Sequence, residues 1–177
     1  MSGKKLAIPI VFLTVFCVVL VMIFWAFDLV VNITPSMPVG IWRVFKDGRD
    51  SKNLKGNIIL ICPHQSKVLL WAMDQEIVGE GRCKSGSIPL LKEVVGVEGD
   101  KVEIFGDEVF LNGKFAAKRH FNMANQLMSE WKSQEISKDE VWVLGTERPE
   151  SFDSRYLGAL KLEGFLGIAR PILVWKI

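Results

Sequence analysis

The sequence contains little histidine and cysteine and has no marked excess of either charge. Its 177 residues include two histidines and three cysteines, and 22 lysines and arginines are set against 20 aspartates and glutamates. This balance, together with the lack of any long basic run, gives no indication that the chain binds nucleic acid. The sequence also lacks internal repeats and low-complexity tracts, which excludes repeat architectures.

Charge is entirely lacking from residues 6–27, a run of 22 residues. A helix of this length spans roughly 33 Å at about 1.5 Å per residue, enough to cross a hydrocarbon layer of about 30 Å. A cleavable signal peptide would have a shorter apolar core followed by small residues at a cleavage site, and residues 28–32 offer no such site. A buried core helix is disfavoured by the length of the run. We therefore expect a retained transmembrane helix.

Lys4 and Lys5 precede this run and predict a cytoplasmic N-terminus. Residues 1–32 are accordingly expected to form a cytoplasmic tail and transmembrane helix, and residues 33–177 a domain exposed beyond the membrane. Short apolar or alternating runs bounded by turn residues predict that this domain is mainly antiparallel β. The expected strands are 58–62, 90–97, 101–105, 108–111, 141–144 and 168–175. A helix is expected over 66–78, whereas 122–132 fits either state.

Two of the three cysteines, Cys62 and Cys83, lie in the exported part. Free thiols rarely persist in an oxidising compartment, so a disulfide is expected; closing a loop of about 20 residues stabilises by about 3 kcal/mol. A zinc site using both thiols and His64 is the alternative, but the Cys-x-His spacing is poor and a fourth ligand is not evident. Cys17 lies in the apolar run, where it is expected to pack as a small apolar residue.

Two segments carry isolated polar residues of chemical interest. Ser36 stands between Pro35 and Pro38, which restrict the backbone and can fix the direction of a hydroxyl, although the same pattern is typical of a stiff linker. Lys92 interrupts the apolar strand at 90–97. Apolar neighbours lower the pKa of a lysine, and a neutral amine can take a proton from a serine. A solvated lysine on an edge strand is the alternative.

A third segment, 144–158, is dense in turn formers and hydrogen-bonding groups. Together the three segments resemble, in order and content, the sequence boxes of the Ser/Lys signal peptidases. The matching stretches are Ser36-Met37-Pro38, then Lys92 with Gly96, Gly99 and Asp100, and finally Ser151-x-Asp153-Ser154-Arg155-Tyr156-x-Gly158. The Ser-Met-Pro-Val-Gly run from Ser36, the Ile61-Cys62-Pro63 and Gly81-x-Cys83 pair, and Pro89-Leu90-Leu91-Lys92 are similar to the TraF-type branch, which serves conjugative transfer.

This resemblance implies a signal-peptidase-like antiparallel β domain and a catalytic dyad, with Ser36 as nucleophile and Lys92 as general base. It implies neither a metal nor a cofactor. The remaining implied roles are oxyanion donors at the Thr34 hydroxyl and the Ser36 amide, a lysine-orienting hydroxyl at Ser151, and a structural pair formed by Asp153 and Arg155.

Four positions depart from the family pattern. Thr146 and Glu147 stand where the family usually has Asp-Asn, Glu98 stands where a proline is usual, and Glu93 replaces a frequent arginine. Because side chains alternate along a strand, Glu93 should point away from the face that carries Lys92.

The TraF-type resemblance implies a peptidase in the bacterial inner membrane with its catalytic domain in the periplasm. Its implied substrate is a pilin precursor, processed by hydrolysis or by joining of the trimmed ends, and its further partners would be type IV secretion components. Two alternatives remain: a general type I signal peptidase acting on many exported proteins, and a non-enzymatic anchored subunit of a secretion apparatus.

Overall fold

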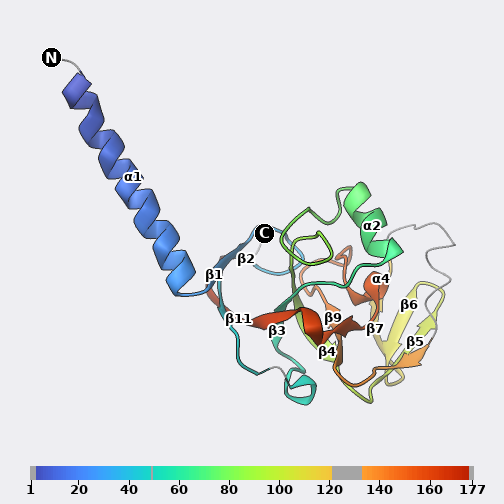
Figure 1. Ribbon diagram of the computed structural model, residues 1–177. Helices are drawn as coiled ribbons and strands as arrows, with labels where there is room; N and C mark the ends of the chain where they lie inside the picture. The colour runs from blue at the N-terminus through green and yellow to red at the C-terminus, as the bar shows by residue number, and fades with distance from the viewer. Residues whose placement is uncertain (1–2, 49, 121–132, 176–177) are drawn as a thin grey trace.

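The computed structural model describes residues 3–48, 50–120 and 133–175, and so the ambiguous segment 122–132 lies outside the described residues. A long N-terminal helix, α1 (Gly3–Ala26), stands clear of a β domain (Figure 1). Its stretch Pro9–Ala26 is long and apolar enough to cross a membrane, and none of it is buried against the rest of the protein. Apolar side chains exposed around a whole helix suit a lipid environment.

The helix ends earlier than the boundary expected at residue 32. Asp28 has a left-handed backbone conformation (φ 49°), and the next four residues form strand β1 (Leu29–Asn32) of the main sheet. The junction is supported by an ion pair of 2.7 Å between Lys46 Nζ and Asp28 Oδ1, and by the Arg43 guanidinium, which lies 5.6 Å from the centre of the Phe27 ring. The polypeptide therefore passes from the helix into the sheet within about three residues.

The large sheet carries both the N-terminal and the C-terminal strands of the domain. Its further strands are β2 (Val39–Phe45), β3 (Ile58–Ile61), β4 (Leu90–Gly96), β9 (Glu140–Leu144), β10 (Leu160–Lys161) and β11 (Phe165–Trp175). Among the described residues the strand order is β1-β2-β11-β3-β4-β9-β10, with antiparallel pairing throughout. Strand β11 thus separates the β1–β2 hairpin from β3 and β4.

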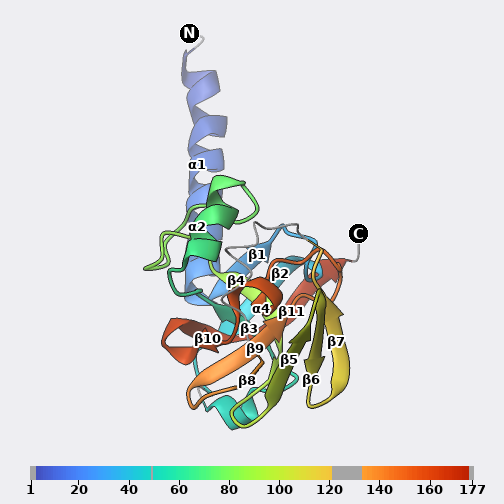
Figure 2. The ribbon, with the colours of Figure 1, turned by 90° about the vertical axis from the view of Figure 1, so that its right-hand side faces the viewer.

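A smaller sheet packs on the side of the domain far from α1 (Figures 1 and 2). It comprises β5 (Lys101–Phe105), β6 (Glu108–Leu111), β7 (Lys114–Lys118) and β8 (Gln134–Glu135), in the order β7-β6-β5-β8. Asn112 and Gly113 both have positive φ and make the β6–β7 turn, as a hairpin Asn-Gly pair should. The two sheets share an apolar cluster that includes Val102, Val109 and Trp142.

Two short helices cover one face of the large sheet. Helix α2 (Lys67–Asp74) begins at Ser66, whose hydroxyl accepts a hydrogen bond from the Leu69 amide at 3.1 Å, and it is shorter than the predicted 66–78. Helix α4 (Ser154–Leu157) is capped by the Asp153 carboxylate. The short 3-10 turns are η1 (Ser51–Asn53) and η2 (Leu162–Gly164). The helices bury side chains against β3, β4 and β9 in the largest apolar cluster.

The mainly antiparallel β architecture on one N-terminal apolar helix confirms the predicted fold class. Strands β5 and β6 coincide with the predicted 101–105 and 108–111, and β3, β4, β9 and β11 overlap their predicted ranges. Strands β1, β2, β7, β8 and β10 were not predicted. The first two are the strands that hold Ser36 between them.

Candidate active site

Ser36 lies in the loop that joins β1 to β2. Asn32, the last residue of β1, pairs with Gly40 of β2 and so closes the loop at its base. Gly40 has a φ of 143°, and a Cβ there would lie 2.1 Å from the Leu173 carbonyl oxygen of β11, which requires glycine. Met37 is 1% exposed and anchors the loop in an apolar cluster that also contains Trp42. The serine therefore follows a fixed backbone.

Lys92 projects from β4, on the strand face that also carries Leu90 and Val94 of the main apolar cluster. Its side chain is buried, and Nζ donates hydrogen bonds to Ser36 Oγ at 2.6 Å and to Ser151 Oγ at 3.0 Å. The structure therefore brings together three residues that lie far apart in the sequence.

Burial disfavours the charged ammonium and is the main reason that the pKa of Lys92 falls to about 8. The nearby Asp153 carboxylate raises this pKa and the Arg155 guanidinium lowers it, both as smaller effects. A lysine with a pKa near 8 has a sizeable neutral fraction at physiological pH. Its free lone pair can then accept the proton of the adjacent serine hydroxyl.

The segment after β9 packs directly on the serine and the lysine. The Glu147 amide donates to the Ser36 carbonyl oxygen at 3.2 Å. Gly145 lies so close to Ser151 that a Cβ would stand 2.1 Å from Ser151 Oγ and 2.9 Å from the Ser36 carbonyl oxygen. The glycine thus lets the two loops approach until Ser151 can reach Lys92.

Asp153 and Arg155 form a buried pair that holds this segment in shape. Arg155 Nε and Nη2 donate to the two Asp153 carboxylate oxygens at 2.9 and 2.8 Å, and Nη2 also donates to the Ser151 carbonyl oxygen at 3.0 Å. Nη1 donates to the carbonyl oxygens of Lys118 and Pro149. The second Asp153 oxygen accepts from the Gly145 amide at 2.8 Å. This hydrogen-bonded pair therefore holds the backbone at Ser151 in place.

Thr34 lines the same cleft as Ser36, and its hydroxyl donates to Asn32 Oδ1 at 2.8 Å. Asn32 was not among the residues singled out from the sequence. A single amide between apolar residues forms no recognisable motif, and only its buried position in the hairpin reveals its contacts. Glu93, in contrast, lines a separate groove with Val95, which agrees with the expectation that it points away from Lys92.

A cleft of about 630 Å³ runs past Ser36 and Lys92. Most of its walls are apolar, and the exposed Arg148 and Glu150 bring charge to its lining. The apolar lining includes Val30, Leu60, Val78, Ile88, Leu91 and Phe152. A cleft of this size and composition can bind an extended apolar segment of polypeptide.

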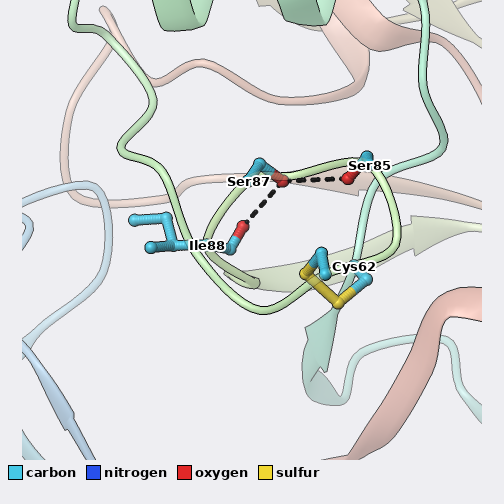
Figure 3. Close-up of a disulfide and its surroundings, with 5 residues drawn as sticks. Cys62, Ser85, Ser87 and Ile88 are labelled. Carbon is cyan, nitrogen blue, oxygen red and sulfur yellow. Dashed lines mark hydrogen bonds between the residues drawn. A yellow bond between two sulfur atoms is a disulfide. The ribbon is translucent and has the colours of Figure 1, made fainter.

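A disulfide joins Cys62 to Cys83 (Figure 3), in the same region as Ile88, which lines the cleft. It ties the end of β3 to the loop that leads into Ile88, with the two Cα atoms 5.5 Å apart. Within the loop, Ser87 Oγ donates to the Ile88 carbonyl oxygen at 3.1 Å and lies 3.1 Å from Ser85 Oγ. Because the two cysteines are bonded to each other, neither is free to ligate zinc.

A family model described as "Signal peptidase, peptidase S26" matches residues 4–175. The chain belongs to this signal peptidase family. It is 29% identical over 176 residues to a probable conjugal transfer protein TraF of Sinorhizobium fredii, covering 98% of this chain and 92% of that protein. It is 28% identical over 148 residues to the conjugal transfer protein TraF of Agrobacterium fabrum, covering 82% of each. These relatives confirm the TraF-type resemblance indicated by the motifs.

Among solved structures, a signal peptidase I from Enterococcus faecalis is similar at 18% sequence identity. The match covers 71% of this chain and 97% of that chain, with a TM-score of 0.36.

Proposed function

We propose that this protein is a membrane-anchored serine endopeptidase in which Ser36 is the nucleophile and Lys92 the general base. The observation that carries the proposal is the contact of 2.6 Å between the buried Lys92 Nζ and Ser36 Oγ. A buried lysine with a pKa of about 8 can exchange a proton with a serine near neutral pH. Membership of a signal peptidase family gives this arrangement its chemical context.

The reaction follows from this geometry. Neutral Lys92 takes the hydroxyl proton as Ser36 Oγ bonds to the carbonyl carbon of the scissile peptide. The resulting ammonium then gives that proton to the departing amine, the C–N bond breaks, and an acyl-enzyme remains. Lys92, again neutral, next takes a proton from water or from an incoming amine as it attacks the ester carbon, and the ammonium returns that proton to Ser36 Oγ as the ester C–O bond breaks. Ser151 keeps the amine aimed at the serine through its bond of 3.0 Å.

The oxyanion of each tetrahedral intermediate would be stabilised by the Ser36 amide and the Thr34 hydroxyl. Both residues line the cleft. Removal of one such donor typically slows catalysis by about 10²–10³-fold. The Thr34 hydroxyl would have to turn from Asn32 towards the substrate to serve in this way.

The proposed substrate is a conjugative pilin precursor at the outer face of the bacterial inner membrane. Two relatives of similar length are named as conjugal transfer proteins. Ser36 follows the end of α1 by ten residues, so the cleft lies near the point where the chain leaves the bilayer. A nucleophile in this position meets cleavage sites that flank the hydrophobic segment of another protein. Components of a type IV secretion apparatus are the expected further partners.

The acyl-enzyme allows two outcomes. Water would release a linear pilin, whereas the terminal amine of the bound pilin would close it into a ring. A well-oriented intramolecular amine competes effectively with water, because its effective concentration far exceeds that of a free amine.

Intact-mass analysis of a pilin precursor co-expressed with this protein tests the proposal. Wild-type enzyme should yield trimmed pilin, and a product lighter than the linear form by one water would show cyclisation. Ser36→Ala and Lys92→Ala should each leave the precursor uncut, whereas Lys101→Ala, a change of an exposed lysine on β5, should process normally. Mature pilin from either active-site variant, at near wild-type yield, would overturn the proposal.

The two alternatives make different predictions. A general signal peptidase would support growth of a strain depleted of its housekeeping signal peptidase, and the pilin enzyme should not. A non-enzymatic assembly subunit would still support conjugative transfer after Ser36→Ala, whereas the proposed enzyme would not.

A further inference from the structure

The loop between β1 and β2, residues 33–38, contains two prolines and so has fewer backbone donors than carbonyl groups. Pro35 and Pro38 have no N–H, so the loop has few amides of its own with which to bond its carbonyl groups. Buried carbonyl groups need partners, and here they find them outside the loop backbone. Asn32, at the end of β1, is 8% exposed, and its side-chain amide bonds to the loop carbonyls.

Five polar contacts converge on this one side chain. The two N–H groups of Asn32 Nδ2 are shared among the carbonyl oxygens of Thr34, Met37 and Pro38, which lie 2.9, 3.0 and 3.0 Å from the nitrogen. Asn32 Oδ1 accepts from the Thr34 amide at 3.2 Å and from the Thr34 hydroxyl at 2.8 Å. The orientation of the amide group is unambiguous, because a backbone N–H can only donate and must therefore face the oxygen.

These contacts hold the loop backbone in place on both sides of Ser36. The Thr34 carbonyl lies two residues before the serine, and the Met37 and Pro38 carbonyls follow it directly. Because the serine lies between the held ends, its distance from Lys92 depends on the Asn32 amide as well as on the loop sequence. The same amide fixes the Thr34 side chain, whose hydroxyl proton points at Asn32 in the free enzyme.

We propose that Asn32 is a positioning residue for the Ser36–Lys92 pair, one that holds the nucleophile loop in its reactive shape. It does not touch the reacting atoms. The inference rests on the proposed function for the roles of Ser36 and Lys92, but the geometry it describes can be measured without any peptidase activity. A hydrogen-bonded amide with no such role would only stabilise the β1–β2 hairpin.

The test replaces the serine by a thiol whose reactivity reports the distance to Lys92. The parent variant combines Ser36→Cys with Cys17→Ala, so that the introduced thiol is the single free one while the disulfide remains intact. The rate of alkylation by iodoacetamide is measured from pH 5 to 10 in the full-length protein in detergent. A thiol beside the Lys92 ammonium has a pKa below the free value of about 8.5, because the cation stabilises the thiolate.

Asn32→Ala and Asn32→Leu are the two test variants, one that truncates the side chain and one that keeps its branched shape without polar atoms. Both are uncharged, so neither alters the charged groups near the thiol. These groups are Lys92 with Asp153 and Arg155 behind it, and Arg148 and Glu150 in the cleft lining. Any movement of the alkylation profile therefore reports a changed position of the loop.

The proposal predicts that the midpoint of the alkylation profile rises by about one pH unit in both Asn32 variants, with alkylation at pH 6.5 slower by about tenfold because less thiolate is present. Lys92→Met in the same parent should raise the midpoint at least as far, and Asn53→Ala, which removes an exposed asparagine, should leave it unchanged. Unchanged midpoints in both Asn32 variants would overturn the proposal. If one variant does not fold, as judged by its thermal unfolding, the other decides the result.

The processing assay separates this inference from the proposed function. In the Ser36 enzyme, Asn32→Ala should lower kcat by about 10–100-fold while KM stays within about threefold, because the defect lies in the reacting geometry and not in substrate binding. A shifted alkylation midpoint in a protein that never cuts a pilin precursor would sink the proposed function and leave the positioning role of Asn32 intact. An unshifted midpoint in an enzyme that does cut the precursor would overturn the positioning role of Asn32 and leave the proposed function intact.

Discussion

Lys92 Nζ lies 2.6 Å from Ser36 Oγ, although 56 positions separate the two residues in the sequence. The amine also bonds to Ser151 Oγ, so it stands between two hydroxyl groups contributed by different loops. The Ser36 hydroxyl can give its proton to the amine, while the Ser151 hydroxyl keeps the lone pair of the amine directed at Ser36. The chemistry of the site therefore depends on the protonation of one amine and on the loops that surround it.

Activity should depend on pH through Lys92. The protonated amine cannot act as a base, and burial holds its pKa at about 8. The rate constant kcat/KM should therefore rise with pH and reach half its plateau near pH 8. The measurement is a series of initial rates of pilin precursor processing between pH 5 and 10. A flat profile across that range would remove Lys92 from the role of base.

Replacement of Lys92 by methionine should abolish processing and yet stabilise the fold. Burial lowers the pKa of Lys92 from 10.5 to about 8, a difference that corresponds to about 3 kcal/mol of destabilisation when the amine is charged. Loss of the hydrogen bonds to Ser36 and Ser151 offsets part of this gain. We expect Lys92→Met to raise the free energy of unfolding by about 1–3 kcal/mol at pH 7.

The pH dependence distinguishes this effect from ordinary repacking. Between pH 8 and 10.5 the unfolded wild-type chain binds more protons at this lysine than the folded chain, so wild-type stability rises with pH in that window. The advantage of Lys92→Met should shrink accordingly and be lost near pH 10.5. Chemical unfolding in detergent at pH 7, 9 and 10.5 measures it, and an advantage that is constant with pH would contradict the explanation.

Gly145→Ala should inactivate the enzyme although no reacting group is changed. The new Cβ would lie 2.1 Å from Ser151 Oγ, so Ser151 must move away from Lys92. A displacement of about 1 Å in a catalytic constellation can cost about 10²-fold in rate. Gly79→Ala is the matched control, because its Cβ would lie 3.7 Å from Ile88 in ordinary contact. Equal processing rates in the two variants would show that Ser151 does not need its present position.

Removal of the disulfide should weaken both the fold and the cleft. The Cys62–Cys83 bond closes a loop with a sequence separation of 21, and its loss is expected to cost about 3 kcal/mol of stability. Processing by the Cys62→Ser, Cys83→Ser double variant should also fall, because the loop leading to Ile88 forms a wall of the cleft. Thermal unfolding and processing rates measure the two effects. Cys17→Ala should change neither, and unchanged stability in the double variant would contradict the prediction.

The predicted strands with strong local signals agree with the structure. Strand β5 alternates, the Asn112-Gly113 turn specifies the β6–β7 hairpin, and β4 is an apolar run bounded by Pro89 and Gly99. The three polar segments could be singled out from the sequence because each combines reactive or turn-forming residues with a family motif. Their meeting around Lys92 could be inferred only by resemblance, since sequence separation carries no direct information on distance in space.

The elements that could not be predicted depend on tertiary contacts. Strand β1 has only four residues and follows helix α1 after a single charged residue, Asp28, so its apolar pattern merges with that of the helix. Asn32 has the same appearance in the sequence as any polar residue at a strand end. Its five contacts arise only when the β1–β2 hairpin closes, and Gly40 permits that closure because β11 presses against it.

The place of β11 in the large sheet has a consequence for the order in which the sheet can form as the chain is synthesised. Strand β11 is the last of the described strands to be synthesised, and it lies between the hairpin that holds Ser36 and strands β3 and β4, the second of which carries Lys92. Until residues 165–175 join the sheet, the β1–β2 hairpin is not hydrogen-bonded to β3 and β4. The contact between Ser36 and Lys92 is therefore expected to form late, once β11 has joined the sheet.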